Sequence, residues 1–189
     1  MHGNKNESKS EAILSASCSL FYKNGFHATG VDLLASNAGI TKKTLYKHFA
    51  TKDTLISATL AHRHTWFTDR LMTALKSDLP TLKHSTAHKY LKFITDWCND
   101  STFSGCMFIN TCAEFSESDH AHHIQAQTHK KFILETLTEH LRKEGLQHPQ
   151  QQAKLLFVFG EGLIVAAQTN SLSHEERVET TTLFLKKFV

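Results

Sequence analysis

The sequence has little proline, glycine or cysteine to interrupt or cross-link it. Its 189 residues include two prolines, eight glycines and four cysteines, with 40% hydrophobic and 21% charged side chains. This composition fits a globular protein and excludes disordered and fibrous chains. No apolar run reaches the roughly 18 residues of a membrane helix, and residues 1–10 lack the apolar core of a secretory signal. We therefore expect a cytoplasmic protein, with no membrane contact, whose cysteines are thiols.

Common catalytic signatures are missing as well. The sequence contains no glycine-rich nucleotide loop, no G-x-S-x-G and no H-E-x-x-H. Glu114 and Glu161 stand in apolar segments, but no base partner is evident for either one. We predict that the protein is not an enzyme and needs no cofactor.

The net charge of +3 is too small to indicate a partner, but the charge is unevenly distributed. Residues 1–52 carry seven lysines against three acidic residues, whereas the remaining 137 residues carry 14 basic against 15 acidic ones. A basic head on a near-neutral body is typical of a nucleic-acid-binding module joined to another domain.

The spacing of apolar residues and helix caps predicts an all-α chain of about nine helices, with no convincing strand pattern. Ser8 with Glu11 resembles a capping box, and Thr29, Thr41 and Ser173 are further expected caps. Gly25 and Gly39 are placed for left-handed turns. The predicted helices cover residues 8–24, 31–38, 42–49, 51–77, 85–99, 106–115, 117–144, 150–170 and 174–189, with Leu79-Pro80 ending the fourth.

Residues 31–49 carry the most specific signal in the sequence. Two short helices joined by a turn at Gly39 have the spacing of a helix-turn-helix, whose second helix enters the DNA major groove. That second helix contains Lys42, Lys43 and Lys47, which can reach phosphates or guanine edges, and Thr44, which can contact a thymine methyl group or a phosphate. Residues 1–52 are therefore predicted to bind double-stranded DNA.

The same region resembles the TetR family of bacterial transcriptional regulators. The resemblance rests on Ile13-Leu14, Leu20-Phe21, Gly25-Phe26, Thr29, residues 38–49 (AGITKKTLYKHF) and residues 52–55 (KDTL). It implies a homodimeric repressor with a three-helix DNA-binding domain over residues 1–52 and an effector-binding and dimerisation domain over residues 53–189. Residues 104–110 and 113–115 are similar to a subgroup in which some members respond to electrophiles or oxidants.

The DNA-contacting residues are expected on and around the second helix of the motif. The resemblance assigns phosphate contacts to Thr29, Tyr46, His48 and Lys52, and groove contacts to Lys42, Lys43, Thr44 and Lys47. The predicted set is Thr29, Thr41, Lys42, Lys43, Thr44, Tyr46, Lys47, His48 and Lys52. The sequence departs from many relatives at Thr41-Lys42-Lys43, where they have Ser-Lys-Gly or Ser-Arg-Gly, so an extra charge replaces a close backbone approach.

The C-terminal region is predicted to form the dimer interface and the effector pocket. The penultimate helix has one stripe of Ala153, Leu156, Phe157, Gly160, Leu163, Ile164 and Ala167, and the last helix adds Val178, Leu185 and Phe188. These two C-terminal helices either meet a second subunit or complete the core of their own subunit. Aromatic walls and polar anchors suit a small apolar effector, although each aromatic residue could equally belong to the core. The predicted pocket comprises Trp66, Phe93, Trp97, Phe103, Cys106, Met107, Asn110, Glu114, His129 and Phe132.

Cys106 is the candidate sensor thiol, because a helix N-terminus stabilises thiolates. A buried packing role is the alternative, and Cys98 is the best resolving partner if a disulfide forms. The histidines near 84–88 and 120–123 lack the completing ligands of a zinc site, so we predict no metal. A metal-responsive regulator and a protein-binding adaptor remain alternative functions. An activator is the alternative to a repressor.

Overall fold

A computed structural model describes residues 3–77 and 85–188 of the chain. Within these ranges it is all-helical, with nine helices and no strand, as predicted. The helices are α1 (Gly3–Asn24), α2 (Val31–Asn37), α3 (Lys42–His48), α4 (Lys52–Lys76), α5 (Ser85–Cys98), α6 (Met107–Glu114), α7 (Ala121–Lys143), α8 (Pro149–Gln168) and α9 (His174–Lys187). The predicted break at Leu79-Pro80 lies outside the described residues.

Several predicted helix ends are confirmed by their capping atoms. Thr41 Oγ1 accepts the amide of Thr44, and Ser173 forms a full capping box with Glu176. Gly25 and Gly39 have φ values of +83° and +64°, in the region that disfavours side chains. The predicted cap at Ser8 is wrong, because α1 already begins at Gly3. Gly30, rather than Thr29, is the N-cap of α2.

The chain packs as two compact units. The first contains residues 1–66 and 107–128, and the second contains residues 67–106 and 129–189. Helices α4 and α7 contribute to both units, so the packing division differs from the functional boundary predicted at residue 52. That functional boundary concerns which residues bind DNA, and it stays a prediction.

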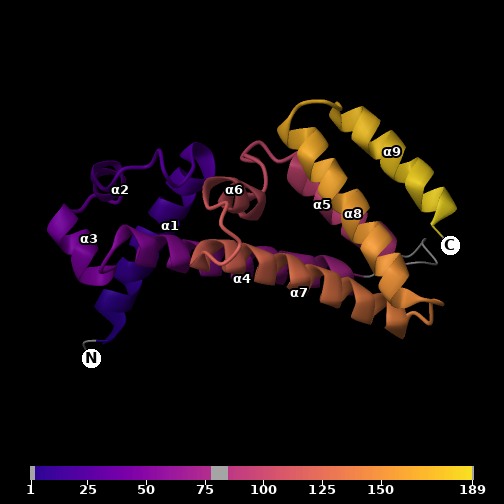
Figure 1. The fold of residues 1–189 in the computed structure, drawn as a ribbon, viewed down its shortest axis with the longest axis horizontal. Helices are drawn as coiled ribbons and strands as arrows, with labels where there is room; N and C mark the ends of the chain where they lie inside the picture. Colours follow the sequence, from indigo (N-terminus) through magenta and orange to yellow (C-terminus); the bar gives the residue numbers. More distant parts are fainter. Residues whose placement is uncertain (1–2, 78–84, 189) are drawn as a thin grey trace. The chain divides into compact units, whose positions relative to one another are not determined.

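In the first unit, α1, α2 and α3 form a small bundle (Figure 1). Phe21, Phe26, Leu34 and Leu45 are each at most 2% exposed and form its core. Helices of 7 residues, such as α2 and α3, are marginal in isolation, so packing of these apolar side chains keeps them folded. The arrangement holds α2 and α3 on either side of the turn at Gly39.

In the second unit, α8 packs against α5, and α9 lies alongside both (Figure 1). The close approach of α5 and α8 depends on Gly160. A Cβ atom built there would lie 2.6 Å from the hydroxyl of Tyr90, which is 1% exposed. A side chain at this position would force the two helices apart.

Candidate nucleic-acid interface and buried thiol

The turn between α2 and α3 is closed by backbone hydrogen bonds. The amide of Gly39 donates to Ser36 O, and that of Ile40 donates to Ala35 O. Because Ala35 and Leu45 are buried, the two helices are fixed against the core of the first unit. The turn and its packing therefore hold α3 in one orientation.

The outer face of α3 is basic and exposed. Lys42, Lys43 and Lys47 are exposed, and Tyr46 retains 45% of its accessible surface. Lys42 Nζ lies 2.7 Å from Asp32 Oδ1 on α2. The hydrogen bond to Asp32 raises the pKa of Lys42, so this side chain stays cationic. At the start of α3, the hydroxyls of Thr41 and Thr44 share a hydrogen bond of 3.0 Å on the same exposed surface.

Three of the predicted DNA-contacting residues are buried or half-buried rather than exposed. Thr29 is fully buried and its hydroxyl donates to Gly25 O at 2.6 Å, so it holds the loop after α1 and does not reach a phosphate in this conformation. His48 is half-buried, and its Nδ1 shares a 2.9 Å hydrogen bond with Ser10 Oγ of α1. Lys52 is half-buried at the first position of α4. We leave Thr29 out of the proposed interface.

Glu114 binds the loop that follows α1. Its carboxylate accepts the amides of Phe26 (2.9 Å) and His27 (2.6 Å), and His27 Nδ1 lies 3.7 Å away. Both oxygens of Glu114 thus accept bonds from the protein, and its role as a polar anchor for an effector stays a prediction. Sequence reasoning missed this contact, which joins residues 88 positions apart.

Phe115 lies at the centre of a histidine cluster in the first unit. Its ring stacks on His120 at 4.7 Å and meets the ring of His122 edge-on. His122 is 2% exposed, with Nδ1 3.3 Å from Ser57 Oγ and Nε2 3.6 Å from Asp53 Oδ1. Among the described residues, no group of three or more histidine, cysteine or acidic side chains could hold a metal ion. His84 lies outside the described residues.

Cys106 is buried in the second unit, one residue before α6 rather than in its first turn. Its amide donates to Gln168 Oε1 at 3.3 Å, and Lys130 Nζ donates to its sulfur at 3.4 Å. The same ammonium donates to both oxygens of Glu161 at 2.8 and 2.6 Å. Burial lowers the pKa of Lys130, but attraction to Cys106 and Glu161 outweighs it and the pKa is raised.

Cys98, the predicted resolving partner, is also buried in the second unit. Burial raises the pKa of its thiol to about 12, despite the opposing charge of Arg177. At neutral pH this sulfur is a thiol rather than the thiolate that attacks an oxidised cysteine. The environment of Cys98 therefore disfavours the resolving role.

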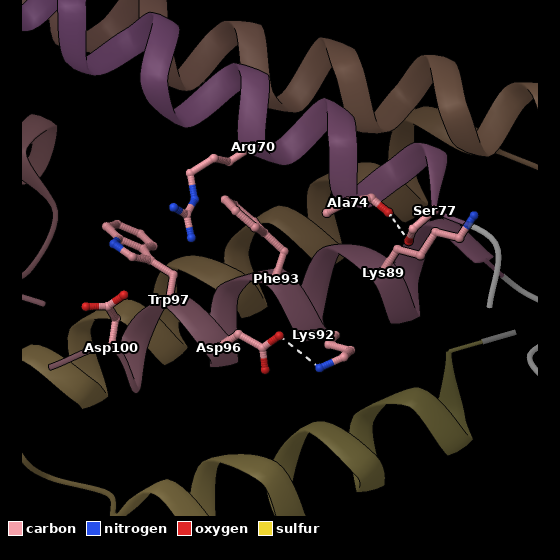
Figure 2. A pocket seen from close by; sticks show the side chains of 9 residues that line it. All are labelled: Arg70, Ala74, Ser77, Lys89, Lys92, Phe93, Asp96, Trp97 and Asp100. Atoms are coloured by element: carbon pink, nitrogen blue, oxygen red, sulfur yellow. Dashed lines mark hydrogen bonds and ion pairs between the residues drawn. The ribbon is translucent and has the colours of Figure 1, made fainter. Parts of the chain in front are cut away.

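Two of the predicted pocket residues line an open cavity of about 430 Å³ in the second unit. Figure 2 shows Phe93 and Trp97 on α5 with Arg70 reaching toward them from α4. Phe103 lines a different cavity, and Trp66 lies 4.0 Å beneath the guanidinium of Arg63 in the first unit.

The remaining predicted pocket residues are dispersed. Met107 and His129 are 2% exposed, whereas Phe132 is 37% exposed and Asn110 is half-buried. None of them lines either of the two cavities described in the second unit. Their assignment to an effector site stays a prediction.

The apolar stripe predicted for the dimer interface is buried within the chain itself. Ala153, Leu156, Leu163 and Ala167 are at most 8% exposed. A different set of apolar side chains on α8 and α9 faces outward, and their exposed fractions run from 43% to 66%. These are Leu155, Val158, Val165, Val178 and Leu183.

A capped helix-turn-helix with an exposed basic second helix defines a DNA-binding protein of the helix-turn-helix class. The family described as bacterial regulatory proteins of the tetR family matches residues 13–59. The match covers the helix-turn-helix and the start of α4, and known transcriptional regulators are similar to this chain over most of its length.

One similar protein is the transcriptional repressor NemR of Escherichia coli. It is 22% identical over 90% of this chain and 94% of its own. The transcriptional activator FasR of Mycolicibacterium smegmatis is 35% identical over 41% of this chain and 33% of its own. These relatives are regulators rather than enzymes.

Solved structures share the fold over nearly the whole chain. A TetR-family regulator from Streptomyces coelicolor has a TM-score of 0.86 and 26% identity, covering 96% of this chain and 94% of its own. The reduced form of E. coli NemR has a TM-score of 0.79 and 21% identity, covering 95% and 96%. In the part of this chain that the structure describes, no helix combines the length and apolarity that a membrane crossing needs.

Proposed function

We propose that the protein is a homodimeric repressor that reads its operator with α3 and releases it when Cys106 is modified or a small apolar ligand binds. The observation that carries the proposal is the row of exposed basic side chains on the second helix of a capped helix-turn-helix. The similarity to the NemR repressor over most of both chains supports repression rather than activation.

DNA reading is assigned to the outer face of α3. Lys43 and Lys47 are exposed and carry the charge, and Tyr46 presents its ring beside them. Lysines bind phosphates or guanine edges in the major groove, and a tyrosine hydroxyl donates to the DNA backbone. Thr41 and Thr44 add two hydroxyls at the N-terminal end of the helix.

Dimerisation is assigned to the outward apolar face of α8 and α9. Leu155 and Val158 are 60% and 66% exposed, and the exposed Gly162 and Val165 follow them about two helical turns later. Apolar side chains in such a continuous row favour burial against a second copy. Two heads in one dimer would then meet half-sites about 34–36 Å apart, one helical turn of DNA.

Release of the operator is assigned to modification of Cys106 and to displacement of α6, which directly follows Cys106 in the sequence. Cys106 is 3% exposed and its sulfur is contacted by Lys130, so an adduct on it cannot fit without displacing its neighbours. Cys106 is covalently followed by α6, whose last residue, Glu114, holds the loop amides of Phe26 and His27. Displacement of α6 would therefore disturb the loop that leads into α2.

The operator-binding experiment uses sites selected from a random DNA library with the full chain. Lys43→Ala is expected to weaken binding about tenfold and to lower the salt slope by about one. Lys131→Ala, an exposed lysine on α7, serves as the control and should bind like the unmodified protein. Binding that does not weaken between roughly 50 and 200 mM salt would favour the protein-binding adaptor instead.

The release experiment compares Cys106→Ser with Cys112→Ser, a half-buried cysteine on α6. N-ethylmaleimide adds its alkene carbon to the cysteine sulfur, and the proton lost by the thiol ends on the neighbouring carbon. Operator release by this reagent should persist in the Cys112 variant and disappear in the Cys106 variant. An equal response in both would exclude the thiol route and leave release to a ligand in the cavity beside Phe93 and Trp97.

A further inference from the structure

A second cavity in the second unit has a mainly polar lining. Its volume is about 400 Å³, and it lies between the connection that follows α5 and the turn between α8 and α9. The polar residues that line it are Cys98, Asp100, Ser104, Gln168, Asn170 and Arg177. A cavity of this size and chemistry is suited to a small polar molecule.

Arg177 is the unusual member of this lining. It is 6% exposed, and its Nη1 donates to Leu172 O at 2.6 Å. Its Nε is buried and has no hydrogen-bond partner, and no acidic side chain forms a salt bridge with it, among the described residues. Hydrogen bonds, and then the charges of His174 and Arg177, lower the pKa of Glu175, so this carboxylate acts on the guanidinium without pairing with it. A buried guanidinium without a hydrogen-bonded anion is costly, because it has lost its hydration shell.

The free edge of this guanidinium fits a carboxylate. With Nη1 held by Leu172, Nε and Nη2 form the side of the group that can donate two parallel hydrogen bonds. Carboxylates accept such paired bonds in one plane, and arginine is the residue that binds them in this way. Gln168, Asn170 and Ser104 add neutral donors and acceptors around that edge.

The other charges in the cavity limit the ligand to a single negative charge. Asp100 lines the cavity, and its carboxylate accepts the amide and the hydroxyl of Thr102 at 2.8 and 2.6 Å. These hydrogen bonds lower the pKa of Asp100, so it is ionised at neutral pH and repels a dianion. Cys98 is a neutral thiol at that pH, since burial raises its pKa to about 12.

We propose that this cavity binds a small monocarboxylate, with the carboxylate group on Nε and Nη2 of Arg177 and the organic part toward Phe103. The site adjoins both other candidate sites, because Gln168 in its lining accepts the amide of Cys106 and Asp100 also lines the cavity beside Phe93. Binding can be measured without DNA, so its outcome does not depend on the operator experiments.

Calorimetric titration of the full chain with sodium acetate, pyruvate and benzoate tests the proposal, with inorganic phosphate at matched ionic strength. At least one monocarboxylate should bind, and phosphate should bind more weakly. Arg177→Met should weaken binding at least tenfold, and Arg177→Lys should restore part of it. Arg142→Met is the control, because Arg142 is an exposed arginine on α7 paired with Glu139.

Gln168→Glu covers the case in which the Arg177 variants do not fold. It keeps an oxygen to accept the amide of Cys106 and adds a negative charge to the cavity, so it should also weaken binding about tenfold. The proposal is overturned if no monocarboxylate binds, if phosphate binds more tightly than all three, or if the folded variants bind like the unmodified chain.

Discussion

The two compact units each contain a glutamate with 22% of its side chain exposed, and they use it differently. In the first unit, Glu114 accepts the amides of Phe26 and His27, so the carboxylate fixes the position of a loop. In the second, Glu161 accepts both of its bonds from Lys130, which also contacts the sulfur of Cys106. The same residue type thus orders backbone in the first unit and holds a cation beside a thiol in the second.

Glycines of the two units also have different structural roles. Gly39 in the first unit supplies a positive φ and has open space around it, whereas Gly160 in the second supplies only space, for the ring of Tyr90. The first unit therefore depends on backbone geometry at its turns, and the second on close packing between helices. Substitutions that separate these two requirements test the comparison directly.

The largest expected effect is at Gly160. Gly160→Ala places a methyl group 2.6–2.9 Å from three atoms of the buried Tyr90 side chain, and this overpacking should cost about 3 kcal/mol relative to Gly162→Ala. Gly162 is on the same helix with no atom within 4 Å of the added methyl group. Urea unfolding followed by circular dichroism measures the difference. Equal stability of the two variants would show that α5 and α8 do not pack closely.

The next largest effect is expected at Glu114. Glu114→Ala leaves the amides of Phe26 and His27 without their acceptor, which should lower the free energy of unfolding by about 2 kcal/mol. Glu117→Ala, at an exposed position between α6 and α7, is the control and should change stability little. Urea unfolding measures both. A Glu114 variant as stable as its control would mean that this carboxylate does not hold the loop.

A smaller effect is expected at Gly39. Gly39→Ala should cost about 1 kcal/mol because an alanine is strained at a φ of +64°, although its Cβ meets no atom within 4 Å. Gly39→Asn is the control, since asparagine tolerates this conformation better. Thermal unfolding ranks the three proteins. Alanine and asparagine variants of equal stability would show that φ is not what this position requires.

Features that depend on residues close together in the sequence could be predicted, whereas contacts between distant residues could not. Caps such as Thr41 and Ser173 depend on residues three positions away, so they could be recognised from sequence alone. The binding of Glu114 to Phe26 and the contact of Lys130 with Cys106 join residues 88 and 24 positions apart. No local pattern specifies such pairs.

Two further differences between prediction and structure have causes within a single helix or loop. Helix α8 is apolar on both faces, so periodicity alone could not tell that Leu156 faces the core while Leu155 and Val158 face outward. Thr29 was assigned to DNA through family resemblance, which does not reveal that its hydroxyl donates to Gly25 O. The lysines of the predicted second helix lie exposed on α3, because a short capped helix on a turn leaves few alternatives, and their contact with DNA stays a prediction.

The smallest expected effect concerns the ion pair between Lys42 and Asp32, and it completes the comparison with the pair in the second unit. Both partners are largely exposed, at 54% and 80%, whereas Lys130 and Glu161 are each 22% exposed. Solvent screens an exposed pair, so Asp32→Asn should leave the urea midpoint unchanged within error. Its effect should appear on DNA instead, where loss of an acidic group beside α3 should tighten operator binding roughly twofold at low salt. Glu11→Gln, an exposed acidic position on α1, is the control for a general change in charge. If both variants tighten operator binding equally, only the net charge of residues 1–52 matters. Tighter binding by Asp32→Asn alone would place Lys42 at the DNA surface.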